Sequence, residues 1–136
     1  MRRFTLFFIL VLALALVACG GDDGGASEPA GEASASRGEE LYKQTAIGAA
    51  SAPGCITCHS LDADVVLVGP PHAGVATRAE TAVAGMSSAE FLEQSIVEPD
   101  EVITEGFSPG VMYQNYGSDL TDQEVADLVA FLETLK

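Results

Sequence analysis

Basic residues and cysteines are both scarce in this sequence. Six Lys and Arg stand against 20 Asp and Glu in 136 residues, which gives a formal net charge of −14. A chain this acidic does not hold nucleic acid through its phosphates. Three cysteines cannot form the disulfide framework of a small secreted domain. The length excludes a large multidomain enzyme and predicts one modest domain.

Charge is also missing from residues 4–18, which read FTLFFILVLALALVA. Arg2 and Arg3 precede this apolar run. The run is shorter than the roughly 20 residues that span a bilayer as a helix. A basic start followed by a short apolar run is typical of an export signal.

The end of the run, LVACG at residues 16–20, resembles the lipobox of bacterial lipoproteins. The resemblance implies that the signal peptide 1–18 is removed and that Cys19 becomes a lipidated N-terminus. More than one acyl chain on Cys19 is enough for lasting attachment. An ordinary signal peptide with an incidental Cys19 and an uncleaved N-terminal anchor are the alternatives. We expect an exported protein, anchored by lipid to the periplasmic or extracytoplasmic face of a membrane.

Large apolar side chains are absent from residues 20–36, GGDDGGASEPAGEASAS. Such a composition favours a flexible tether. We therefore expect a lipidated cysteine and an acidic linker over residues 19–36 and a folded domain over residues 37–136. A domain of this size supports its fold only marginally with an apolar core alone, so a bound cofactor would help.

The most specific motif is C-x-x-C-H, present as CITCH at residues 55–59. It is the attachment sequence for c-type haem. The thiols of Cys55 and Cys58 add to the two haem vinyl groups, and His59 becomes the proximal iron ligand. A thioredoxin-type pair, a zinc site and a plain disulfide are the alternatives. They fit less well, because AIGAASAPG before the motif does not read as a strand and His72 is the one remaining histidine.

Residues 38–136 resemble a class I, single-haem cytochrome c. Four further segments carry the resemblance: Gly38-Glu39-Glu40-Leu41-Tyr42, Gly69-Pro70, Met112 and Leu120-Thr121. The resemblance implies an all-α fold, with helices wrapped around one covalently attached haem c. It also implies that the N- and C-terminal helices cross, with Gly38 and Tyr42 facing Phe131.

Capping boxes predict two helices in the domain. TDQE at residues 121–124, followed by apolar residues at helical spacing as far as Leu135, predicts a terminal helix. SSAE at residues 87–90 begins a middle helix, which Pro99 ends. Residues 37–44 indicate a weaker first helix.

Three residues compete for the sixth position on the iron. The resemblance places the ligand methionine at Met112, in an irregular stretch between the middle and terminal helices. Met86 lies beside the cap of the middle helix and reads as a core or surface filler. His72 reads as a solvated loop histidine, although bis-His ligation stays open. Ligation by His59 and Met112 would saturate the iron and raise its potential, as in a one-electron carrier.

The resemblance assigns Pro70 a supporting role beside the haem, and the chemistry of their side chains suggests roles for Arg78, Tyr113 and Tyr116. The carbonyl of Pro70 would accept a hydrogen bond from the His59 ring, and a turn without that role is the alternative. Arg78 is expected either to pair with a haem propionate or to lie solvated on the surface. The hydroxyl of Tyr113 or Tyr116 is expected to hydrogen-bond a propionate.

Two features depart from the pattern of the family. Tyr113 stands where a proline often follows the ligand methionine, which predicts a less rigid loop around Met112. The stretch 44–54 is longer than the few residues that usually precede the first haem cysteine. The surface formed by residues 49–53 has no assigned role.

Together these patterns predict a membrane-tethered electron-transfer protein, not an enzyme, that carries one electron between respiratory or photosynthetic complexes. Its charge favours donor and acceptor complexes with basic docking surfaces, and we expect a monomer. One alternative is a gas-sensing or peroxidase-like haem domain with a labile sixth ligand, which Tyr113 motivates. The others are a subunit held permanently in a respiratory assembly and an acidity that only reflects a saline habitat.

Overall fold

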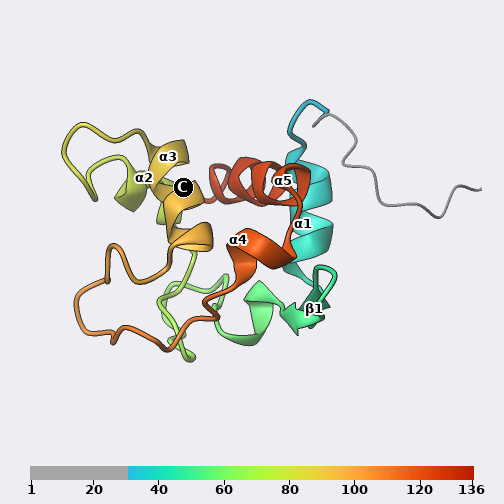
Figure 1. Cartoon of the computed structure of the whole chain (residues 1–136). Coiled ribbons are helices and arrows are strands. Elements are labelled where there is room, and N and C mark those ends of the chain that lie inside the picture. Colours follow the sequence, from blue (N-terminus) through green and yellow to red (C-terminus); the bar gives the residue numbers. More distant parts are fainter. Residues whose placement is uncertain (1–30) are drawn as a thin grey trace, which may run out of the picture.

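The computed structural model describes residues 31–136 of the chain, which Figure 1 shows whole. The expected signal peptide, Cys19 and most of the expected linker lie outside the described residues. The elements follow in the order α1 (Ala35–Tyr42), β1 (Ala46–Ile47), β2 (Ala52–Pro53), the 3₁₀ helix η1 (Cys55–Thr57), α2 (Val75–Ala79), α3 (Ser88–Val97), α4 (Tyr116–Asp119) and α5 (Asp122–Leu132). The described part is mostly helical, as predicted. No helix within residues 31–136 has the length and apolar character needed to cross a membrane.

Helix α1 begins two residues before the domain boundary expected at Arg37. Ser34 is its N-cap, and the Ser34 side chain accepts a hydrogen bond from the Arg37 backbone N–H. Asp127 on α5 holds the same turn, since its carboxylate accepts from the Ser34 N–H at 2.7 Å and from Arg37 Nε at 2.7 Å. Residues 34–36, assigned to the linker from composition, therefore belong to the first helix and its cap.

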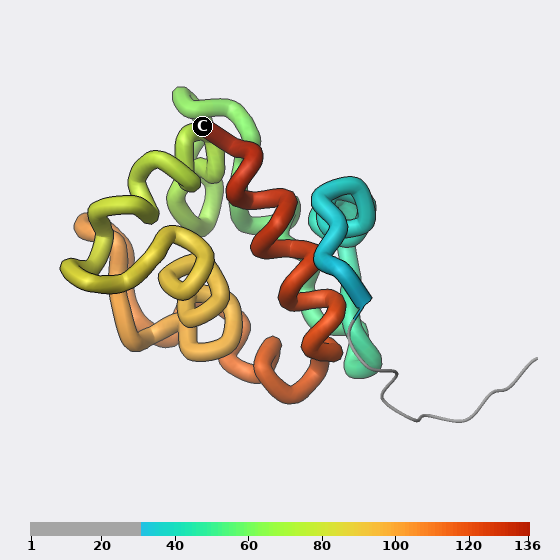
Figure 2. The backbone as a smooth tube through the Cα atoms, turned by 90° about the horizontal axis from the view of Figure 1, so that it is seen from above, coloured from blue at the N-terminus to red at the C-terminus, as the bar shows by residue number. Residues whose placement is uncertain are grey.

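Helices α1 and α5 cross at Gly38, and α5 runs between α1 and α3 (Figure 2). A Cβ atom on Gly38 would lie 1.9 Å from the Asp127 carbonyl oxygen and 2.9 Å from Cβ of Phe131. Glycine is therefore required for this close approach. The buried Tyr42 ring packs on the Phe131 ring at a centroid distance of 5.2 Å. The crossing and its three predicted residues are confirmed.

Both capping boxes start helices where the sequence predicts them. Ser87 and Glu90 exchange side-chain and backbone hydrogen bonds at the start of α3, and Thr121 and Glu124 do the same at the start of α5. The apolar faces of these helices join one core, whose largest members include Tyr42, Leu92, Ile96, Tyr116, Val125, Leu128, Phe131 and Leu132. This core supports one wall of the cavity described below.

The unassigned stretch 44–54 forms a small β-hairpin. Strands β1 and β2 pair antiparallel, with Ile47 opposite Ala52, and both side chains are buried. The turn is tied to the end of α4, because the Ala49 N–H donates to the Asp119 carbonyl at 3.1 Å. This short hairpin is added to a domain that is otherwise helical, as predicted. Strands of two residues are too short to show the alternation by which a strand is recognised in sequence.

Candidate functional site

A mainly apolar cavity of about 760 Å³ opens between helices α3 and α5, the segment 53–59 and the loop 99–113. Its volume lies within the roughly 300–1,000 Å³ typical of cofactor and ligand sites. Every site residue proposed for the domain lines it: Cys55, Cys58, His59, Pro70, Arg78, Met112, Tyr113 and Tyr116. His72 lines it too, whereas Met86 does not. The fold thus brings residues from distant parts of the chain to one site.

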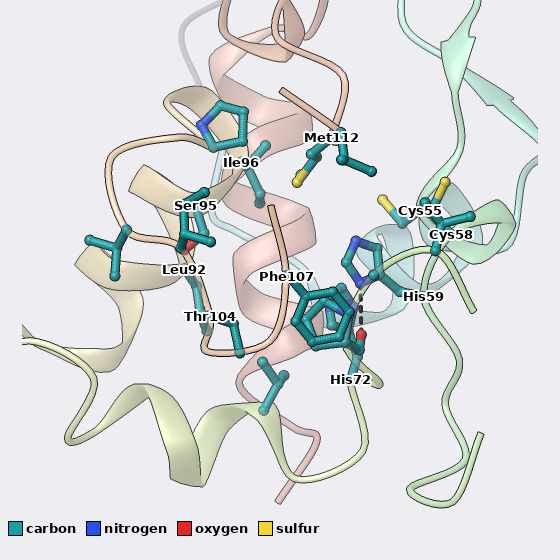
Figure 3. A pocket seen from close by; sticks show the side chains of 18 of the residues that line it. Cys55, Cys58, His59, His72, Leu92, Ser95, Ile96, Thr104, Phe107 and Met112 are labelled. Atoms are coloured by element: carbon teal, nitrogen blue, oxygen red, sulfur yellow. Dashed lines mark hydrogen bonds between the residues drawn. The ribbon is translucent and has the colours of Figure 1, made fainter. Parts of the chain in front are cut away.

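The two cysteines and the histidine of the motif share one tight turn. The backbone N–H groups of Cys58 and His59 both donate to the Cys55 carbonyl, at 3.1 and 2.9 Å. This turn places both side chains beside the His59 ring on one wall of the cavity (Figure 3). Both cysteines carry free thiols. Burial raises the pKa of the Cys55 thiol to about 11, so it is a protonated thiol at neutral pH.

The His59 ring is held in one tautomer. Its Nδ1 lies 2.8 Å from the Pro70 carbonyl oxygen, which can only accept, so Nδ1 carries the proton. The other nitrogen, Nε2, points into the cavity with its lone pair free (Figure 3). Burial lowers the pKa of His59, and the hydrogen bond to Pro70 opposes this only in part. A Cβ atom on Gly69 would lie 2.4 Å from His59 Cε1, so glycine lets the Pro70 loop pass beside the ring.

His72 is a correction to the sequence-based interpretation, because it is not a solvated loop residue. Its ring stacks on His59 with centroids 4.0 Å apart and an interplanar angle of 16°. Its Nδ1 is buried without a hydrogen-bond partner. Burial, and then the neighbouring His59 and Arg78, lower the pKa of His72 to about 3. Two ligands on opposite sides of one metal point toward each other and do not stack, so this geometry does not fit bis-His ligation by His59 and His72.

Met112 lies across the cavity from His59, on the loop between α3 and α4 (Figure 3). Its side chain is half-buried and packs on the core cluster. Met86 is also half-buried but lies outside the cavity, just before the cap of α3. Of these two methionines, Met112 is therefore the one that borders the cavity lined by His59.

Arg78 binds the loop that carries Pro70 and His72. Its Nη1 donates to the Ala73 carbonyl at 2.6 Å and its Nη2 donates to the Pro71 carbonyl at 2.5 Å. The guanidinium thus clamps the turn whose carbonyl orients His59. Arg78 still borders the cavity, and its remaining N–H groups are available to an anionic group there.

The hydroxyls of Tyr113 and Tyr116 each have an acceptor within the protein. The Tyr113 hydroxyl donates to the Asp119 carboxylate at 2.5 Å, and the Tyr116 hydroxyl donates to the Pro53 carbonyl. Each hydroxyl donates its one proton to a protein acceptor, so the predicted hydrogen bond to a haem propionate would require that hydroxyl to turn away from it. The hydrogen bond to Asp119 raises the pKa of Tyr113, and burial raises that of Tyr116 to about 12. These residues instead connect the Met112 loop to α4 and to the hairpin.

The donor set fits a covalently held haem and no bare metal ion. Two thiols, one imidazole nitrogen and one thioether border a single apolar cavity of suitable size. Within residues 31–136, no group of three or more His, Cys, Asp and Glu is arranged to hold a metal ion by side chains alone. A zinc site would need further ligands beside Cys55, Cys58 and His59.

Comparison with known proteins agrees with the site. No curated protein matches the chain. The family model of cytochrome c matches residues 35–136, beginning at the first residue of α1. The match covers the helices, the C-x-x-C-H turn and the Met112 loop, and this family binds haem c and generally works in electron transfer. The chain therefore belongs to the cytochrome c family.

Proposed function

We propose that this protein carries one electron at a time between two partner proteins, using a single haem c joined to Cys55 and Cys58 and ligated by His59 and Met112. The cavity carries this proposal, because it brings both thiols, the His59 Nε2 atom and the Met112 side chain to its wall. Family membership supports electron transfer as the activity. When bound, the haem supplies a reversible one-electron couple.

The protein itself orients ligands and excludes water. The Pro70 carbonyl and the stacked His72 ring restrict the rotation of His59. A hydrogen-bond acceptor such as the Pro70 carbonyl raises the basicity of a ligating histidine and holds its orientation. Leu92, Ile96 and Leu128 keep one wall of the cavity apolar. With the Met112 thioether and the neutral His59 imidazole as its ligands, in apolar surroundings, a bound haem would favour the reduced form and hence a raised potential.

Met112 and the tyrosine after it bear on the alternative of a reactive haem. A sensor or peroxidase-like domain needs an iron position that opens readily. Tyr113 in place of a proline predicts a loop around Met112 that opens readily. However, the Tyr113 hydroxyl is bound to Asp119 and its ring packs against Tyr116 at a centroid distance of 5.0 Å. These contacts favour a retained Met112 and therefore the electron carrier.

We also propose a lipid anchor at Cys19 and partners with basic docking surfaces. Cys19 and its lipobox-like sequence lie outside the described residues and rest on the sequence alone. Around the cavity, Asp100 and Glu105 contribute negative charge, and Arg78 is the one Lys or Arg among the lining residues. Complementary charge steers association and makes it sensitive to salt. Respiratory or photosynthetic complexes are the proposed donor and acceptor.

The visible and near-infrared spectrum of the oxidised protein, produced with a haem-maturation system, tests the ligand set. We expect low-spin haem bands and a weak sulfur-to-iron charge-transfer band in the wild type and in Met86→Ala. Met112→Ala should lose the charge-transfer band. A low-spin spectrum without that band in the wild type contradicts methionine ligation, a high-spin spectrum supports a reactive haem, and absence of haem contradicts the whole proposal.

A further inference from the structure

Asp100 contacts the loop that carries Met112 at two points. Its two carboxylate oxygens accept hydrogen bonds from the Gly110 N–H at 2.8 and 3.0 Å, ten residues along the chain. Its Oδ1 also accepts from Gln114 Nε2 at 3.2 Å. The same Nε2 donates to the Met112 carbonyl at 2.8 Å. One carboxylate thus holds the backbone two residues before Met112 and, through Gln114, the backbone of Met112 itself.

The backbone around Asp100 is held in place, so its side chain can restrain a neighbouring loop. It lies three residues after the end of α3, and the preceding Pro99 is buried with its φ restricted by the ring. The Glu101 N–H donates to the Glu98 carbonyl at 3.0 Å, which closes a turn around Asp100. The carboxylate is therefore attached to the end of a helix that packs on α5.

The loop between Asp100 and Met112 has few other polar contacts. For residues 102–111, the hydrogen bonds in the described structure are those to Asp100 and one local bond from the Phe107 N–H to the Thr104 carbonyl. Most of these residues are exposed. A segment with exposed backbone and few bonds opens at low free-energy cost. The contacts of Asp100 are thus the main polar restraint that keeps this loop in place.

The charge of Asp100 strengthens this restraint. Hydrogen bonds to an ionised acceptor are roughly twice as strong as neutral ones. Gly110 has a φ of 73°, in the left-handed region, where a residue other than glycine would be strained. A turn of this kind directs the Gly110 N–H at Asp100. The contact between Asp100 and Gly110 restrains the loop on the N-terminal side of Met112. On the C-terminal side, Tyr113 stands where many members of the family have a proline.

We propose that Asp100 is the positioning residue that keeps the Met112 thioether on the iron, acting through Gly110 and Gln114. This inference rests on the His59–Met112 ligation proposed above. Without the Asp100 contacts the loop opens more often, and an external ligand replaces Met112 more easily. The fold therefore uses a carboxylate at the end of α3 to keep the sixth position closed.

The test measures the affinity of the oxidised, haem-loaded protein for imidazole, together with the sulfur-to-iron charge-transfer band. Imidazole is used because the neutral form of this ligand is insensitive to the loss of one negative charge. We expect Asp100→Ala to bind imidazole about tenfold more tightly or better, because charged hydrogen bonds of this kind restrain the loop. Asp100→Asn keeps one acceptor oxygen for Gly110 and should be intermediate, and Gln114→Ala should also bind more tightly than wild type.

The matched control is Glu101→Gln, which removes the same charge from the next residue. The Glu101 side chain neither lines the cavity nor makes a hydrogen bond within the described chain. The affinity of the Glu101→Gln variant for imidazole should lie within about twofold of the wild-type value, as expected for a surface substitution away from such contacts. If Glu101→Gln and Asp100→Ala raise the affinity for imidazole equally, the inference is overturned, because the effect then comes from the loss of negative charge in general.

Two further outcomes separate this inference from the proposed function. A wild-type protein that shows the sulfur-to-iron band, with an Asp100→Ala variant that binds imidazole as weakly as wild type, overturns the positioning role and leaves the ligand set intact. A wild-type protein without the band overturns His59–Met112 ligation, and the positioning role with it.

Discussion

His72 stacks on His59, and its buried Nδ1 has no hydrogen-bond partner. The stack supports the imidazole that is proposed to ligate the iron. A buried polar atom without a partner costs stability, at about 1–3 kcal/mol. His72 therefore combines a favourable contact with an unfavourable one.

Replacement of His72 separates these two contributions. His72→Leu keeps most of the packing volume and removes the unpartnered nitrogen, so we expect stability to rise by about 1 kcal/mol. His72→Ala leaves a void beside His59 and should lower stability by about 2 kcal/mol. Denaturant unfolding of the haem-loaded proteins measures both. A leucine variant as unstable as the alanine variant would show that the imidazole stack itself stabilises the fold.

The reduction potential should depend on Met112 and not on Met86. Loss of the thioether removes the ligand that favours the reduced iron, so Met112→Ala should lower the potential by on the order of 0.1 V or more. Met86 lies outside the cavity, and Met86→Ala should leave the potential nearly unchanged. Potentiometric titration provides the measurement, and an unchanged potential in Met112→Ala would refute the ligand assignment.

Gly38 should tolerate no side chain. The added methyl group of Gly38→Ala meets the Asp127 carbonyl oxygen at 1.9 Å, so α1 and α5 must move apart. We expect a loss of about 3 kcal/mol or more in unfolding free energy. Glu40→Ala, an exposed substitution on the same helix, should change stability by less than about 0.5 kcal/mol. Similar stability of Gly38→Ala and wild type would mean that the two helices are not in close contact.

We expect protonation of the Asp127 carboxylate to lower the stability of the folded protein at acid pH. Burial acts to raise its pKa, but hydrogen bonds from Arg37, Ser34 and Gln123 outweigh this and hold the pKa below the ordinary 3.8. A lowered pKa in the folded state means that the stabilisation is complete above about pH 4 and is lost as the pH falls through the folded value. Asp127→Asn should therefore lower the Tm at neutral pH, by about 5 °C or more.

The difference in Tm between wild type and Asp127→Asn should shrink as the pH falls below about 4, since both then carry a neutral side chain. Glu93→Gln removes an exposed charge on α3, and its Tm should vary with pH as that of the wild type does. Thermal unfolding followed by circular dichroism between pH 2.5 and 7 gives these curves. A difference that stays constant over this range would exclude Asp127 ionisation as its cause.

Local patterns made much of this fold predictable. The pairs Ser87–Glu90 and Thr121–Glu124 are capping boxes whose partners lie three residues apart, so the sequence alone locates the starts of α3 and α5. The C-x-x-C-H turn is equally local. The fold and the main ligand candidates follow from such spacings together with the family resemblance.

Contacts between distant segments were not predictable in the same way. The burial of His72 depends on Tyr42 and His59, which other parts of the chain supply. Asp100 lies in an exposed acidic stretch, and nothing in that stretch indicates that it binds Gly110. The hydroxyl of Tyr113 has an acceptor at Asp119 that the family pattern does not suggest. Each of these requires the path of the chain in space.

The attachment of Ser34 to Asp127 determines where tension on the preceding segment would act. Residues 31–52 contribute nothing to the wall of the cavity, and Ser34 is bound to α5 by its backbone N–H. A pull on the chain before Ser34 is therefore borne by this hydrogen bond, the Arg37–Asp127 ion pair and the crossing at Gly38. None of these three contacts involves a residue of the Pro70 or Met112 loop. The proposed tether would therefore act first on the crossing of α1 and α5, ahead of the loops that carry Pro70 and Met112.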